Sequence, residues 1–180
     1  MSIPRPHEDE HPPYALTYVN AAAAALARHD LSDILPLLAR QPGDLATLLH
    51  GVSVEAARSS YAPGKWTLLE SLVHTVDTER VFSYRLLRAA RGDRTPLVGF
   101  EHDDWVPLSG ANDRTLSSVI AEFGAVRSST IALLEPLDQN MLAKRTLASG
   151  HEVSARALGW LIAGHVDHHL TLIRERYLAG

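Results

Sequence analysis

Three histidines form the most informative pattern in this sequence. His165 and His169 stand four residues apart in an apolar segment, and His74 lies far from them in a second segment with helical periodicity. Residues at positions i and i+4 of a helix share one face, so two imidazole rings can converge on one ion. A third ring from a neighbouring helix would complete a set of three nitrogen ligands. Three protein ligands with one open position are typical of catalytic metal sites.

A pair of histidines at this spacing also has an ordinary explanation. The chain has 10 histidines among 180 residues, so pairs four apart arise readily by composition. His7 and His11 form another such pair, in a polar and proline-bearing segment where it predicts no site. His165 differs because its neighbours are apolar, and a buried imidazole needs a partner. Satisfied core histidines remain the alternative, and His168 remains a second possible partner of His165, because a pair at i and i+3 can also bind a metal.

Length and composition indicate one globular domain. With 180 residues, of which 46% are hydrophobic, the chain can bury a substantial core but has little room for a second domain. The net charge is −4 and both signs are scattered along the sequence, so no basic stripe predicts nucleic acid as a partner. The chain has no cysteine, which excludes disulfides and thiolate ligands and leaves nitrogen and oxygen atoms to bind any metal.

The first residues of the chain differ in composition from the rest. Residues 1–13 are charged and proline-rich, and they predict a flexible tail ahead of a single domain at residues 14–180. They lack the apolar stretch of a secretory signal, and no apolar run of membrane-spanning length occurs in the sequence. We therefore expect a cytoplasmic protein without a membrane partner.

The periodicity predicts an all-α fold. Strand signals are weak, whereas long stretches rich in Ala, Leu, Arg and Glu repeat at helical spacing. Four main helices are expected at residues 31–50, 66–91, 115–134 and 154–178, preceded by a helix-prone spacer within residues 14–28. Pro42 and Gly43 should kink the first helix or divide it into two pieces.

Two long connections join the predicted helices. Residues 92–114 are too many for a tight hairpin, so this connection should be a crossover or a functional loop. Residues 136–153 should again be irregular, with a short helical turn near Asp138.

Helical projection places the histidines on surfaces of different kinds. On the second helix, His74 shares its side with polar residues that include Asp77 and Arg85, so it faces either solvent or a polar cleft inside the bundle. On the fourth helix, His165 lies in the middle of the apolar side, close to His169. Periodicity alone does not decide between these surroundings.

Two longer stretches resemble the motifs of a known family. Residues 61–82 (YAPGKWTLLESLVHTVDTERVF) are similar to the opening motif of the DinB/YfiT-like superfamily of metal-binding four-helix bundles. Residues 164–177 (GHVDHHLTLIRERY) are similar to its closing motif, and residues 91–105 resemble its inter-helix loop. The resemblance covers nearly the whole chain from about residue 14 onward.

The resemblance implies a ligand set, a topology and an assembly. In the family, one His on the second helix and a His-x-x-x-His pair on the last helix hold the metal, and these positions correspond to His74, His165 and His169. The family also implies an up-up-down-down bundle, in which residues 92–114 are the crossover, and a homodimer. One departure is His102, at a loop position where an amide side chain is expected.

The implied chemistry is that of a divalent transition metal, Zn²⁺ or Ni²⁺, on three neutral imidazoles. Such an ion lowers the pKa of a bound water or thiol and polarises a substrate oxygen. The resemblance therefore implies a metal-dependent enzyme acting on a small molecule, either by hydrolysis or by transfer of a low-molecular-weight thiol to an electrophile. A non-catalytic bundle that binds a metal or a small molecule, with a role in stress, is one alternative, and a helical bundle for protein association is another.

Further residues near the predicted ion are assigned by position. Asp77 lies one turn from His74 and could orient a ring or accept a proton as a catalytic group, although a solvated surface carboxylate explains it equally well. The candidates for substrate binding are Tyr18, Trp66, Arg85 and Trp105. Arg85 and Tyr18 would contact an anionic or polar substrate, and the two tryptophans would wall the cleft.

Overall fold

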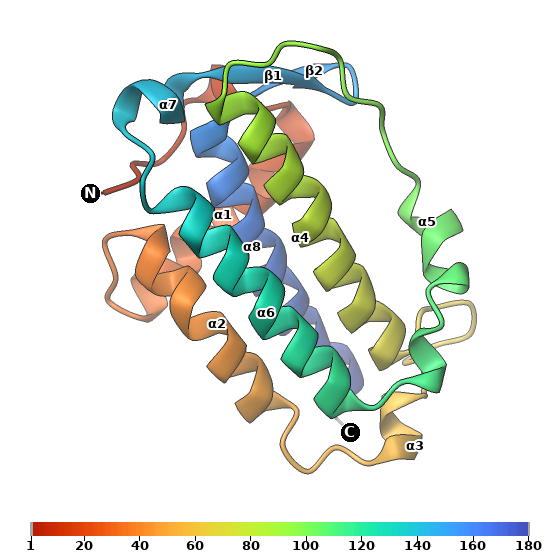
Figure 1. The fold of residues 1–180 in the computed structure, drawn as a ribbon. Coiled ribbons are helices and arrows are strands. Elements are labelled where there is room, and N and C mark those ends of the chain that lie inside the picture. The colour runs from red at the N-terminus through yellow and green to blue at the C-terminus, as the bar shows by residue number, and fades with distance from the viewer. Residues whose placement is uncertain (1, 180) are drawn as a thin grey trace.

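The computed structural model describes residues 2–179, and most of them are helical. The bundle consists of four long helices, α2 (Ile34–Leu48), α4 (Leu68–Ala90), α6 (Leu116–Leu134) and α8 (Ala155–Leu172) (Figure 1). Each lies within the range that the periodicity predicts for it, and the all-α four-helix architecture is confirmed. No helix within residues 2–179 is long and apolar enough to cross a membrane.

The directions of the four helices correct one detail of the expectation. Glu79 contacts Arg127 and Ser83 contacts Thr130, so residue numbers rise together along α4 and α6 and these helices are parallel. Figure 1 shows α2 and α8 running the opposite way, which makes the order up-down-down-up rather than up-up-down-down. The long connection between α4 and α6 allows these two helices to be parallel. Parallel neighbours can be joined only by a chain that returns along the length of the bundle.

This connection is the predicted crossover. It runs along the outside of the bundle and contains α5 (His102–Trp105) and two short 3-10 turns, Val106–Leu108 and Ala111–Asp113 (Figure 1). The connection between α2 and α4 contains the short helix α3 (Val54–Ala57). Beyond α8 the chain continues as a π-helical turn at Ile173–Tyr177.

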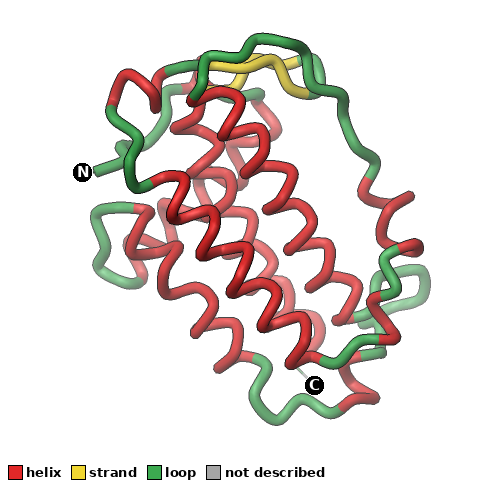
Figure 2. Tube along the Cα trace, in the orientation of Figure 1, coloured by secondary structure: helices red, strands yellow, loops and turns green. Residues whose placement is uncertain are grey.

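The connection between α6 and α8 is more regular than its sequence suggests. The helical turn expected near Asp138 is α7 (Gln139–Ala143), and the Asp138 side chain caps it. A hairpin follows, with β1 (Arg145–Ala148) antiparallel to β2 (His151–Ser154) (Figure 2). Each strand has only 4 residues, too few for an alternating pattern to stand out from the surrounding loop.

The expected spacer within residues 14–28 is a well-packed helix. α1 (Leu16–Arg28) lies against α8, and a Cβ atom added to Gly164 would stand 1.8 Å from the carbonyl oxygen of Tyr18. The backbones of α1 and α8 therefore touch at this point, which only glycine allows.

Residues 2–13 pack on the bundle instead of forming the expected flexible tail. Ile3 is only 3% exposed, and its carbonyl oxygen accepts a hydrogen bond of 3.2 Å from Nε1 of Trp160. The buried carboxylate of Glu10 pairs with Arg156 at 2.7 Å. A charged composition suggested disorder, but single side chains of this segment find partners on α8 that composition cannot reveal.

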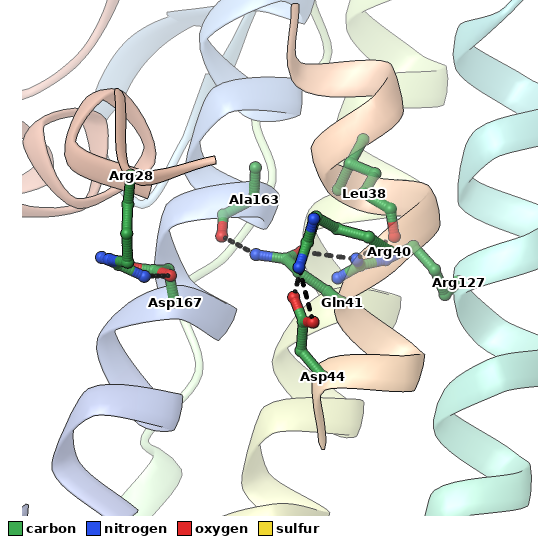
Figure 3. A network of polar contacts seen from close by, with 8 residues as sticks. All are labelled: Arg28, Leu38, Arg40, Gln41, Asp44, Arg127, Ala163 and Asp167. Carbon is green, nitrogen blue, oxygen red and sulfur yellow. Dashed lines mark hydrogen bonds and ion pairs between the residues drawn. The ribbon is translucent and has the colours of Figure 1, made fainter. Parts of the chain in front are cut away.

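α2 passes through Pro42 without breaking, contrary to the expected kink or division. Proline has no N–H group, so the carbonyl of Leu38, four residues earlier, loses its helical hydrogen bond. Nη1 of Arg127 on α6 donates to this oxygen instead, at 2.9 Å (Figure 3). A tertiary hydrogen bond therefore replaces the missing helical one.

The same guanidinium links all four helices of the bundle. It donates to both carboxylate oxygens of Glu79 on α4, each at 2.8 Å, and to Oε1 of Gln41 on α2 at 2.6 Å. Nε2 of Gln41 in turn donates to the carbonyl of Ala163 on α8 at 2.8 Å (Figure 3). Both side chains of the Arg127–Glu79 pair are only 1% exposed, so their charges depend on each other for stabilisation.

We predict that replacing Arg127 by Ala lowers the free energy of unfolding by about 3–5 kcal/mol, because it leaves the Glu79 carboxylate buried without a counter-charge. Urea denaturation of the purified variant measures this loss. Arg80→Ala is the control on α4, since Arg80 is 47% exposed and its ion pairs with Asp77 and with Glu122 on α6 should together contribute less than about 1 kcal/mol. Equal losses in the two variants would contradict the prediction.

Candidate metal centre

α4 and α8 lie side by side and bring the three predicted histidines into one cluster. His74, on α4, and His165 and His169, on α8, each offer one nitrogen atom within 4.8 Å of the other two. The ring centroids of His165 and His169 are 4.5 Å apart, and the His74 ring lies 5.2 and 5.1 Å from them. All three side chains are buried.

Capping interactions fix where each of these helices begins, and hence which way the histidines point. At the start of α4, Thr67 Oγ1 accepts from the Glu70 N–H at 3.1 Å, and Glu70 Oε2 accepts from the Thr67 N–H at 2.8 Å. At the start of α8, Ser154 Oγ accepts from the Ala157 N–H at 2.9 Å. Both signals are readable in the sequence as N-cap residues.

The three imidazoles are neutral at physiological pH. Burial lowers the pKa of His74 to about 4, with a further contribution from the nearby His102. Burial and then repulsion from His74 lower the pKa of His169 to about 3, and burial followed by repulsion from His169 lowers that of His165 well below its ordinary value. Neutral imidazoles keep a lone pair available, which is the form that binds a metal.

Neighbouring side chains hold the three rings in place. Ser71 Oγ lies 3.4 Å from Nδ1 of His169. The Trp66 ring lies 4.8 Å from the His74 ring, and the Tyr18 ring meets His165 edge-on with centroids 5.2 Å apart. A set of neutral nitrogen donors suits divalent transition metals and does not suit Mg²⁺ or Ca²⁺, which prefer oxygen ligands. The residues present therefore fit a divalent transition metal.

The cluster opens into a cleft with a volume of about 440 Å³. Three of the four predicted substrate-binding residues, Tyr18, Trp66 and Arg85, line this cleft. Trp105 is not among the lining residues; it is 47% exposed and its ring packs against Phe100 at 5.1 Å. Its position at the surface of the crossover explains the difference.

Asp77, the predicted catalytic carboxylate, does not line the cleft. Its Oδ1 atom accepts a hydrogen bond of 3.2 Å from Nη1 of Arg80, and its side chain is 35% exposed. A residue three positions after His74 is rotated by about 60° around the helix, which turns it away from the cluster. The assignment of Asp77 as an acid or base near the ion is therefore corrected.

Several cleft residues were not assigned to the site from the sequence. Thr78 lies one turn after His74 on the same face, so periodicity could have identified it, and its buried Oγ1 atom has no partner within residues 2–179. His102 and Ser149 come from the crossover and from the hairpin tip, where no periodicity exists. The His102 ring lies 5.4 Å from that of His74, and His168 also faces the cleft.

Comparisons with known proteins agree with this architecture. No curated protein matches the sequence. Among solved structures, YfiT from Bacillus subtilis, described as a probable metal-dependent hydrolase with an unusual four-helix bundle topology, matches with a TM-score of 0.72 and 16% identity, over 96% of this chain and 90% of the YfiT chain. A family model described as the DinB superfamily matches residues 37–173, a range that contains all three clustered histidines. Because that match covers most of the chain, this protein belongs to the DinB superfamily.

Proposed function

We propose that this protein is a metal-dependent enzyme that acts on a small molecule, with His74, His165 and His169 holding Zn²⁺ or Ni²⁺. The observation that carries the proposal is the convergence of three buried, neutral imidazoles on the floor of an open cleft. A site that only stabilises a fold is usually closed by four protein ligands, whereas three ligands beside a cleft leave room for a substrate. The description of YfiT as a probable metal-dependent hydrolase supports the same reading.

The protein's own residues would prepare the site in three ways. Ser71 Oγ can accept a hydrogen bond from Nδ1–H of His169, which keeps the proton on Nδ1 and leaves the lone pair on Nε2 free. Tyr18 and Trp66 cover two of the rings and limit access of water to them. His102 and His168 face the cleft and can exchange protons with a bound molecule. A divalent ion, when bound, would supply Lewis acidity at this position.

Two reactions are compatible with this proposal, hydrolysis and transfer of a low-molecular-weight thiol to an electrophile. A volume of about 440 Å³ lies in the range of small-molecule sites, which fits either substrate. The second candidate function is a non-catalytic metal or small-molecule binding protein. It is favoured by one observation, namely that no carboxylate from residues 2–179 lines the cleft as a general base.

We predict that His74→Ala, His165→Ala and His169→Ala each weaken Zn²⁺ binding by more than about a hundredfold, since loss of an outer partner of a ligand already costs up to that much. Equilibrium dialysis followed by elemental analysis measures the bound metal. His168→Ala is the matched control, because His168 neighbours His169 in sequence and its ring lies 5.5 Å away, outside the three-histidine cluster. Equal metal retention by His168→Ala and His169→Ala would contradict the ligand assignment.

We also predict that the Zn²⁺ affinity changes less than about tenfold between pH 7 and pH 5. The affinity should stay nearly constant because the pKa values of His74 and His169 are lowered, to about 4 and about 3, so these rings stay unprotonated throughout this range. Three imidazoles with the ordinary pKa near 6.5 would instead lose affinity roughly ten-thousandfold, because protons would compete at every ligand. Dialysis at the two pH values distinguishes these outcomes.

A survey of reactions tests the enzymatic proposal. We expect chelation to abolish the turnover of at least one ester, amide or thiol-plus-electrophile pair, and Zn²⁺ or Ni²⁺ to restore it. Asp77→Asn should keep this activity, because its side chain pairs with Arg80 outside the cleft, while His169→Ala should lose it. Metal binding without any metal-dependent turnover would instead favour the non-catalytic binding protein.

A further inference from the structure

Arg85 differs from the other buried arginine of the bundle in having no acidic partner. Arg127 and Arg85 are 1% and 7% exposed, respectively. Arg127 pairs with both oxygens of Glu79, whereas no carboxylate within residues 2–179 lies within ion-pair distance of the Arg85 guanidinium. Burial lowers the pKa of Arg85, but a guanidinium stays protonated in proteins. An uncompensated buried charge is costly, so Arg85 favours the binding of an anion from outside the chain.

Two loops hold the Arg85 side chain at the wall of the cleft. Its Nη2 atom donates to the carbonyl of Val98 at 3.2 Å and to Ser149 Oγ at 2.9 Å. These loops are joined, since Leu97 N–H donates to the Leu147 carbonyl at 2.8 Å and Ser149 N–H donates to the Leu97 carbonyl at 2.9 Å. Ser149 has a φ of 53°, a left-handed conformation that positions it at the tip of the hairpin.

The rest of the Arg85 guanidinium remains available to a ligand. Within the described part of the chain, the Nε and Nη1 atoms of Arg85 donate no hydrogen bond. Both atoms remain accessible to solvent. Arg85 lines the same cleft as the three histidines. Each of these free N–H groups can donate a charge-assisted hydrogen bond to an oxygen of a carboxylate or phosphate.

The stretch between Arg85 and the histidines is aromatic. Arg85 follows His74 by 11 residues on α4. This separation is about 16 Å along the helix axis. The long Arg85 side chain leans toward the N-terminus of the helix, which brings its guanidinium closer to His74. Tyr18, Phe82 and Phe100 line the cleft along this stretch, and the guanidinium lies 5.6 Å from the Phe100 ring. The cleft therefore has an imidazole end, an aromatic middle and a cationic end.

We propose that the cleft binds an elongated small molecule with an apolar middle and a terminal anionic group, a carboxylate or a phosphate, which pairs with Arg85. This inference rests on the proposed function, because it names the class of substrate for that site. With the anionic group at Arg85, the reactive end of the molecule would lie at the histidine cluster. The anion-binding step itself involves only Arg85 and its loops. It can therefore be tested without metal and without turnover.

The test uses the full chain after treatment with EDTA. Phenylbutanoate, phenylpropyl phosphate and the neutral phenylbutanamide serve as probes, and calorimetry or ligand-observed NMR measures their affinities. We expect at least one of the two anions to bind about tenfold or more tightly than the amide, as charge-assisted hydrogen bonds to a partly desolvated guanidinium predict. Comparison of the two anions identifies which group the site prefers.

Variants assign the preference to Arg85. Arg85→Met should abolish the difference between anion and amide, and Arg85→Lys, which keeps the charge in case the first variant does not fold, should retain only part of it. Arg88→Met is the matched control on the same helix, because Arg88 pairs with Asp93 and does not line the cleft. Equal binding of anion and amide by the unaltered protein, or a preference that survives in Arg85→Met, would overturn the proposal. Neither outcome depends on whether the histidines bind a metal.

Discussion

One buried guanidinium holds the four helices of the bundle in register. Arg127 reaches α2 and α4 directly and α8 through Gln41, so a shift of any one helix would leave a charge or a polar group without its partner. Such a group costs several kcal/mol in the interior, which makes one arrangement much more stable than its neighbours. Both ends of this network lie close to the metal cluster, since Ala163 precedes His165 by two residues and Glu79 follows His74 by five.

The cleft combines two kinds of electrostatic environment. Its floor consists of imidazoles that burial and mutual repulsion keep uncharged, and its far end carries the Arg85 cation without an internal counter-ion. Among the described residues, no carboxylate lines the cleft itself, and the nearest acidic influence on the cluster is Asp103, which lines an adjoining pocket with Trp66 and His169. A divalent cation on the three histidines would extend the positive potential over the whole cleft and favour anionic molecules further.

Local signals predicted the helices and the histidine cluster, and long-range contacts account for what they missed. Periodicity and capping residues are local, and the spacing of His165 and His169 places both on one face, while the choice of His74 and His169 as partners came from the family resemblance. The continuity of α2 through Pro42 depends on Arg127, which is distant in sequence. The hairpin and the order of helix directions are likewise set by pairings between distant segments. Asp77 was misplaced because the projection shows which residues share a side but not which neighbouring helix each one faces.

The contact between α1 and α8 has a consequence for biosynthesis. The tight approach of Tyr18 to Gly164 joins segments near opposite ends of the chain, and two of the three clustered histidines lie on the same late helix. While the ribosome is still making α6, α1 therefore lacks the surface on which it packs, and its apolar side stays exposed. Closure of such a large loop before any packing energy is gained also slows folding. The apolar side of α1 is therefore covered only once α8 has emerged.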